Sequence, residues 1–133
     1  MRNGKPVRVV IGTRYALFRE GVKAMLGSSA TIEVIGEAAT VRETVALAER
    51  LRPDVVLIGP EMHDLSVVGG VRRIRDLNPE VKVLMMPLQD EPCVISDYLK
   101  AGAAGCIDKH DGRLGLCHAV LQNGNRRPVN AAY

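Results

Sequence analysis

Five short apolar runs, spaced evenly along 133 residues, constrain the fold of this chain more than any other feature. They begin at residues 7, 32, 54, 81 and 104, and an interval of roughly 25 residues fits a strand, a turn, a helix and a second turn. The first, third and fourth runs are nearly all apolar, which is typical of strands covered on both faces of a sheet. The predicted strands are 7–11, 32–36, 54–58, 81–86 and 104–107.

The segments between these runs repeat apolar residues with helical period, so each predicts an amphipathic helix. Thr40 and Glu43 have the spacing of a capping box, and Ser66, Asp90 and Asp111 suit the N-caps of later helices. Five alternating strand–helix units with right-handed crossovers predict an α/β, doubly wound parallel sheet with helices on both faces. The predicted apolar helix faces are Phe18, Val22, Met25 and Leu26; Val41, Val45 and Ala48; Val67, Val71 and Ile74; Val94, Ile95, Tyr98 and Leu99; and Leu114, Cys117 and Leu121.

Composition narrows the class of protein. Eighteen Lys and Arg against 15 Asp and Glu give a net charge of +3, which does not by itself indicate a nucleic-acid-binding surface. One Phe, three Tyr and no Trp argue against a base-stacking platform or a flavin sandwich. Three cysteines without a C-x-x-C pair indicate reduced thiols. With no signal-peptide core and no apolar run near the roughly 20 residues of a membrane span, we expect a soluble cytoplasmic domain.

A ligand site in such a sheet is expected beyond the carboxyl ends of the strands. The first turn, Gly12-Thr13-Arg14, is not the glycine-rich cradle that a dinucleotide or a P-loop needs. The loop after the third run, Glu61-Met62-His63-Asp64, has potential metal ligands, but their spacing matches no metal motif. The sequence therefore predicts no cofactor, no metal site and no catalytic residues.

Several separate stretches, in order, resemble the receiver domain of bacterial response regulators, in particular the NarL/FixJ (LuxR-type) branch. The resemblance covers nearly all of residues 5–125. It implies a CheY-like (flavodoxin-like) five-stranded parallel sheet of order 2-1-3-4-5. The stretches that carry it are Ala16–Val22, Val34–Ala38, Arg52–Ile58 and Ala101–Gly105.

The residues at the family's phosphorylation site differ in this chain. The family places an acidic pair for a divalent cation after the first strand, where Thr13 and Arg14 stand, and the phosphate-accepting Asp after the third strand, where Gly59 stands. A glycine supplies no nucleophile. A hydroxyl and a guanidinium do not replace the carboxylates that a hard cation prefers.

Two further positions depart from the family and one agrees with it. Pro87 stands where the family has Thr or Ser after the fourth strand, and Cys106 replaces the switch aromatic of the fifth strand, whereas Lys109 is the family's lysine. Proline donates no hydrogen bond from its side chain or its backbone. We therefore expect the aspartyl-phosphate switch to be absent, with rescue by the displaced Glu61 or Asp64 disfavoured.

Arg14 and Lys109 admit two interpretations. They could form a small basic pocket that binds an anion or an acidic small molecule beside the space vacated at Gly59. Alternatively they pair with Glu61, Asp90 or Asp108, because an unpaired charge in a cleft is costly.

A dimer surface is expected from the resemblance, since the family uses the fourth helix, fifth strand and fifth helix, or the first and fifth helices. The alternative interpretation places most of the candidate apolar side chains in the core. The candidates are Tyr98, Leu99, Ile107, Leu116 and Val120.

Two functions follow as hypotheses. The first is a degenerate receiver over residues 1–124, which regulates transcription without phosphorylation as a homodimerisation or docking module. Residues 125–133 would be a tail or linker towards a helix-turn-helix domain that contacts DNA, so the chain is either a fragment or a stand-alone receiver. The second function is a sensor of a small acidic ligand. A fold of this type permits catalysis without implying it. An enzyme is not expected, because no nucleophile–base pair, metal cluster or phosphate cradle is found at the strand ends.

Overall fold

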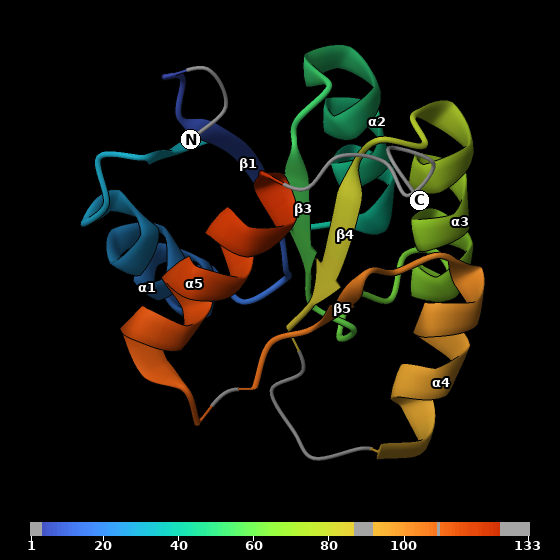
Figure 1. The fold of residues 1–133 in the computed structure, drawn as a ribbon. Coiled ribbons are helices and arrows are strands. Elements are labelled where there is room, and N and C mark those ends of the chain that lie inside the picture. Colours follow the sequence, from blue (N-terminus) through green and yellow to red (C-terminus); the bar gives the residue numbers. More distant parts are fainter. Residues whose placement is uncertain (1–3, 87–91, 109, 126–133) are drawn as a thin grey trace.

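The fold is an alternating series of strands and helices, seen in a computed structural model that describes residues 4–86, 92–108 and 110–125 (Figure 1). Pro87, Lys109 and the tail beyond residue 125 lie outside the described residues. The strands are β1 (Val7–Gly12), β2 (Ile32–Ala38), β3 (Val55–Ile58), β4 (Lys82–Met85) and β5 (Gly105–Cys106). The helices are α1 (Ala16–Gly27), α2 (Val41–Leu51), α3 (Val67–Leu77), α4 (Pro92–Ala101) and α5 (Gly112–Gly124).

The five strands form one parallel sheet in the order β2-β1-β3-β4-β5, which confirms the predicted fold. The pairing of β1 with β2 is irregular at one point. Val9 pairs with Val34 but Val10 pairs with Gly36, so Ile35 is an additional residue on β2. This is a β-bulge, and the pairing resumes as far as Gly12 and Ala38.

Apolar side chains cover both faces of the sheet, which explains why the central strands are almost continuously apolar. Val10, Val56 and Val83 face α2, α3 and α4, whereas Val9 and Leu57 face α1 and α5. Figure 1 shows α1 and α5 side by side on one face of the sheet and α3 and α4 on the other. Within the described part of the chain, no helix is both long and apolar enough to cross a membrane.

Local capping signals place the starts of two helices as predicted. The Thr40 hydroxyl accepts the Glu43 amide (3.1 Å), while the Glu43 carboxylate accepts the Ala39 amide (3.1 Å), so the capping box forms around α2. Ser66 accepts the Gly69 amide at the start of α3 (3.1 Å). Asp111 precedes α5 as predicted but makes no side-chain cap hydrogen bond.

Strand ends differ from the prediction mainly in β5. Its regular ladder is limited to Gly105–Cys106, although residues 104–107 were expected to be extended. The Ala104 amide still donates to the Val83 carbonyl (2.8 Å) and the Ile107 amide to the Met85 carbonyl (2.7 Å). The predicted segment therefore lies along β4, and only its two central residues form regular sheet.

Candidate functional site

The carboxyl ends of β1 and β3 bring Thr13 and Gly59 together at one edge of the sheet. The Gly59 amide donates to the Gly12 carbonyl (2.8 Å), and the Thr13 amide donates to the Ala38 carbonyl (3.0 Å). Thr13 is fully buried and Gly59 is also buried. The structure thus places these two predicted site residues next to each other, where the sheet topology puts a ligand site.

The space beside Gly59 is occupied by another side chain. A Cβ built on Gly59 would collide with Glu61 Oε2, and it would lie 3.0 Å from Thr13 Oγ1 and 3.1 Å from Thr13 Cβ. Glu61 follows β3 in a turn that directs its carboxylate back over residue 59. The vacated space that an acidic ligand was expected to use is therefore filled by the chain itself.

Thr13 is held from two sides. Its hydroxyl donates to Glu61 Oε2 (3.4 Å), and its backbone carbonyl accepts a guanidinium N–H of Arg19 (2.7 Å). The Thr13 hydroxyl is therefore committed to a carboxylate of the same chain, and Arg19 connects the site to α1.

Arg19 also belongs to an ion-pair cluster that the sequence did not reveal. Its Nε lies 3.3 Å from Glu37 Oε1, and Lys23 Nζ lies 2.8 Å from Glu37 Oε2. The hydrogen bond from Lys23, supported by the nearby Arg19 charge, lowers the pKa of the Glu37 carboxyl below its ordinary value. The sequence signal for this cluster was an acidic residue, Glu37, next to the second predicted strand. Its position in the sequence did not show that Arg19 and Lys23 of α1 would pair with it.

Arg14 lies outside this buried group. It is exposed, and its guanidinium carbon lies 5.3 Å from the centre of the Tyr15 ring, in cation–π geometry. Lys109, the other half of the predicted basic pocket, and Asp90 lie outside the described residues.

Asp64, the second displaced carboxylate, has a structural role. It accepts the backbone amides of Val41 (2.8 Å) and Arg42 (3.1 Å), so it caps the N-terminus of α2 from a distant segment. The Val41 bond is the main cause that lowers the pKa of the Asp64 carboxyl. Asp64 is directed to the helix and not towards Gly59.

Cys106 is exposed on β5, and its thiol donates to the Ile107 carbonyl (3.6 Å). Partial burial, with the negative charge of Asp108, raises the pKa of the Cys106 thiol. A raised pKa keeps the thiol protonated, so this position is unlike that of a reactive cysteine. Pro87, the other altered switch position, lies outside the described residues.

The residues at this edge do not fit the divalent cation that the family implies. Thr13 supplies one neutral hydroxyl that is already donated to Glu61, Gly59 supplies no ligand, and Glu61 adds a single carboxylate. Across the described ranges, no three His, Cys, Asp or Glu side chains are grouped to hold a metal ion. Hard cations are bound by several oxygen ligands, and this site offers too few.

The predicted dimer surface divides into core and exposed residues. Tyr98 is 7% exposed, Leu116 4% and Val120 0%, because they pack in the two cores. For these three side chains the surface prediction was wrong, and the alternative interpretation, which placed them in the core, agrees with the structure. Leu99 is 48% exposed and Ile107 is half-buried against the α1 and α5 core.

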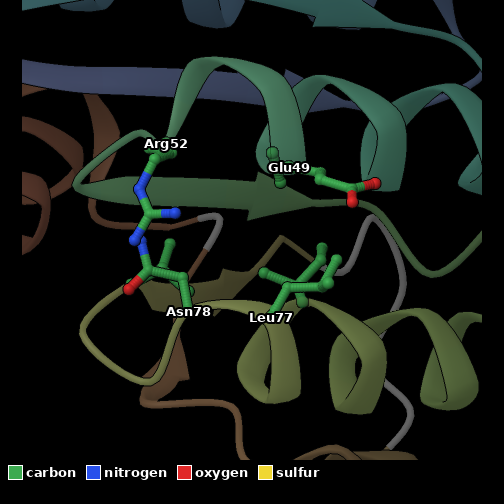
Figure 2. A pocket seen from close by; sticks show the side chains of 7 residues that line it. Glu49, Arg52, Leu77 and Asn78 are labelled. Atoms are coloured by element: carbon green, nitrogen blue, oxygen red, sulfur yellow. The ribbon is translucent and has the colours of Figure 1, made fainter.

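A cavity of about 120 Å³ lies away from this site, between the C-terminal ends of α2 and α3 (Figure 2). Glu49 and Arg52 border it from the α2 side, and Leu77 and Asn78 from the α3 side. Because Arg52 and Asn78 precede β3 and β4, the cavity is at the amino ends of the strands, opposite the edge with Gly59.

Comparison with known proteins identifies the relatives of this fold. Residues 15–121 match the response regulator receiver domain family. The chain is 34% identical to the probable transcriptional regulatory protein NarL of Mycobacterium tuberculosis over 98% of its own length and 62% of that protein. It is 32% identical to the transcriptional regulatory protein DegU of Brevibacillus brevis over 89% of its length and 50% of that protein.

A solved structure agrees with these sequence matches. The signal receiver domain of the putative response regulator NarL from Mycobacterium tuberculosis superimposes with a TM-score of 0.86 at 32% identity, covering 92% of this chain and 99% of that one. The chain thus spans only about half to three-fifths of the length of the regulators it matches, and the matched part is the signal-receiving fold.

Proposed function

This chain belongs to the response regulator receiver domain family and is related to NarL/LuxR-type transcriptional regulators, and on that premise we propose that it regulates transcription without accepting a phosphoryl group. In this proposal it is a degenerate receiver, acts as a docking module in the cytoplasm and catalyses no reaction. Contact with DNA is made through a linked or partner helix-turn-helix domain.

The observation that carries the proposal is the residue at the carboxyl end of β3. Gly59 has no side chain, and phosphoryl transfer to a protein needs a nucleophile. The neighbouring groups do not restore the chemistry. Asp64 caps α2, and the Glu61 carboxylate, the nearest alternative acceptor, has Oε2 on the Thr13 hydroxyl and Oε1 shielded from solvent. Catalysis is not proposed, because this edge offers no nucleophile paired with a base.

The proposed partner is a second copy of the chain, through the face formed by α1 and α5. The two most exposed large apolar side chains of the described residues are Leu17 on α1 (85%) and Leu114 on α5 (72%). The two helices are joined by a hydrogen bond from Arg113 to Ser28 (3.4 Å), and an apolar cavity of about 90 Å³ lies between them. Exposed apolar side chains on adjacent helices are typical of a surface that binds another protein.

A phosphoryl mimic tests the proposed independence from phosphorylation. We expect beryllofluoride with Mg²⁺ to leave the mass of the purified chain in light scattering and its melting temperature unchanged, because no acceptor carboxylate extends from residue 59. Acetyl phosphate should leave no acid-stable or hydroxylamine-sensitive phosphoryl group on the chain. A receiver that carries the acceptor Asp, treated in parallel, shows that the reagents are active.

Either a shift in oligomeric state with the mimic or a stable acyl phosphate would overturn the proposal. The small-ligand sensor is not pursued as a second function, because the space it required beside Gly59 is filled by Glu61.

A further inference from the structure

We propose that Glu61 plugs the receiver pocket: its carboxyl group occupies the volume that a side chain on residue 59 would fill, and so closes the pocket to an external phosphoryl group or acidic ligand. The inference deepens the proposed function and rests on it, since it explains how the pocket is kept closed in a chain that lacks the acceptor.

The geometry of the pocket supports this role. A Cβ on Gly59 points at Glu61 Oε2, at a separation that real Cβ atoms do not adopt. The other Glu61 oxygen, Oε1, is shielded from solvent, and Thr13 beneath it is fully buried. The carboxylate is therefore inserted into the site and does not extend into water.

Chain connectivity explains how a glutamate reaches this place. The turn at Pro60 and Glu61 reverses the backbone just after β3, so a side chain that starts two residues later returns over Gly59. The Thr13 hydroxyl then meets Oε2. A carboxyl group of the chain is thus part of the pocket without any modification, whereas a phosphoryl group would enter only on modification.

The absence of a side chain at residue 59 and the presence of Glu61 are consequently coupled. The carboxylate can occupy the pocket only while residue 59 has no side chain, because any Cβ there would displace it. Two groups that compete for one volume show non-additive effects when both are changed, whereas independent sites add.

A double-mutant cycle measures this coupling. We expect Gly59→Ala to lower the melting temperature by about 4 °C, because the Glu61 carboxylate must leave the pocket. In the Glu61→Ala background the same substitution should lower the melting temperature by half as much or less, since only Thr13 still crowds the new methyl group. Equal losses in the two backgrounds would overturn the inference.

Asp64→Ala provides a matched control. Asp64 is a carboxylate of the same loop, but it caps α2. Gly59→Ala should therefore lower the melting temperature by the same amount in the Asp64→Ala background as in the unchanged chain.

A second measurement uses the unaltered chain and does not depend on the variants folding. We expect a nuclear Overhauser effect between the Glu61 γ-protons and the Gly59 α-protons, because the side chain lies over that residue. Its absence would overturn the inference.

The two proposals fail separately. An additive cycle with no response to beryllofluoride removes the role of Glu61 and leaves phosphorylation independence standing. A coupled cycle with a clear response to beryllofluoride keeps Glu61 in the pocket of the free chain and removes phosphorylation independence.

Discussion

At the scale of single residues, Glu37 connects α1 to the end of β2 through two ion pairs. Its carboxylate pairs with Arg19 and Lys23 of α1, and Arg19 also donates to the backbone of Thr13. One acidic residue therefore links α1, β2 and, through Arg19, the edge that carries Thr13.

Replacing Glu37 tests this dependence. We expect Glu37→Gln to lower the free energy of unfolding by up to about 1 kcal/mol at neutral pH, because both ion pairs are partly exposed and screened by water. The folded state lowers the Glu37 pKa, so this contribution is present above the usual Glu pKa and is lost as pH falls through the lower, folded value. Urea denaturation at neutral and acidic pH measures the difference.

Glu33→Gln is the matched control, since Glu33 is exposed on the same strand. A loss for Glu37→Gln that was the same at acidic and neutral pH would contradict the ion-pair account.

Caps differ in how far a sequence reveals them. Thr40 and Glu43 are three residues apart, so their spacing alone predicted the capping box that the structure contains. Asp64 caps the same helix from 23 residues away, and no local pattern marks it. Contacts within one helical turn can be predicted from a sequence, whereas contacts between two distant segments depend on how the chain folds and cannot.

At the scale of elements, the packing of α2 against α3 depends on a missing side chain. A Cβ on Gly70 would lie 2.7 Å from Val41 Cγ1, whereas a Cβ on the preceding Gly69 would lie 3.5 Å from Ser66 Oγ, an ordinary contact. Gly70 is buried and Gly69 is exposed. Glycine lowers helix stability at both positions, but the packing of α2 against α3 requires it only at residue 70.

Alanine at these two positions should act in opposite directions. We expect Gly69→Ala to stabilise the chain by about 0.5–1 kcal/mol, because alanine favours the helix. Gly70→Ala should destabilise it by about 1–3 kcal/mol, because the added methyl overpacks the contact with Val41. Chemical denaturation of both variants is the measurement, and a gain in stability for Gly70→Ala would contradict the packing argument.

The elements themselves were largely predictable. Continuous apolar runs mark β1, β3 and β4, since covered strands need apolar side chains on both faces. The short β5 was less legible, because only Gly105 and Cys106 complete the ladder. The helical period of apolar residues did not separate core from surface in α5, where Leu116 and Val120 are buried and Leu114 is exposed.

At the scale of the whole molecule, two exposed apolar surfaces of the described residues would lead to different versions of the proposed dimer. Leu114 marks the α1 and α5 face, and Leu99 marks α4 on the other face of the sheet. We expect Leu114→Arg to raise the dissociation constant of the dimer by 10-fold or more, because burying an unpaired charge in an interface is costly. Leu99→Arg should leave it unchanged.

Sedimentation equilibrium of the two variants decides between the faces. A dimer weakened only by Leu99→Arg would contradict the α1 and α5 interface and favour one through α4.

The candidate site was half predictable. Strand ends placed Thr13 and Gly59 at one edge, because carboxyl ends of parallel strands meet there. The Gly59-Pro60 pair marks a turn after β3. No sequence pattern shows that the side chain of Glu61 points from this turn into the space beside Gly59.

The additional residue on β2 has a consequence for that edge as well. Had the pairing continued without a bulge, Ile35 would pair with Val10, and Glu37 would lie beside Gly12. A side chain at position 12 would point at Thr44 of α2. The bulge shifts the alternation by one, so Glu37 lies beside Ile11 and shares its face with α1. One inserted residue in an outer strand thus decides which layer of helices the carboxylate serves, and it is the reason that Arg19 can reach Glu37 and Thr13 together.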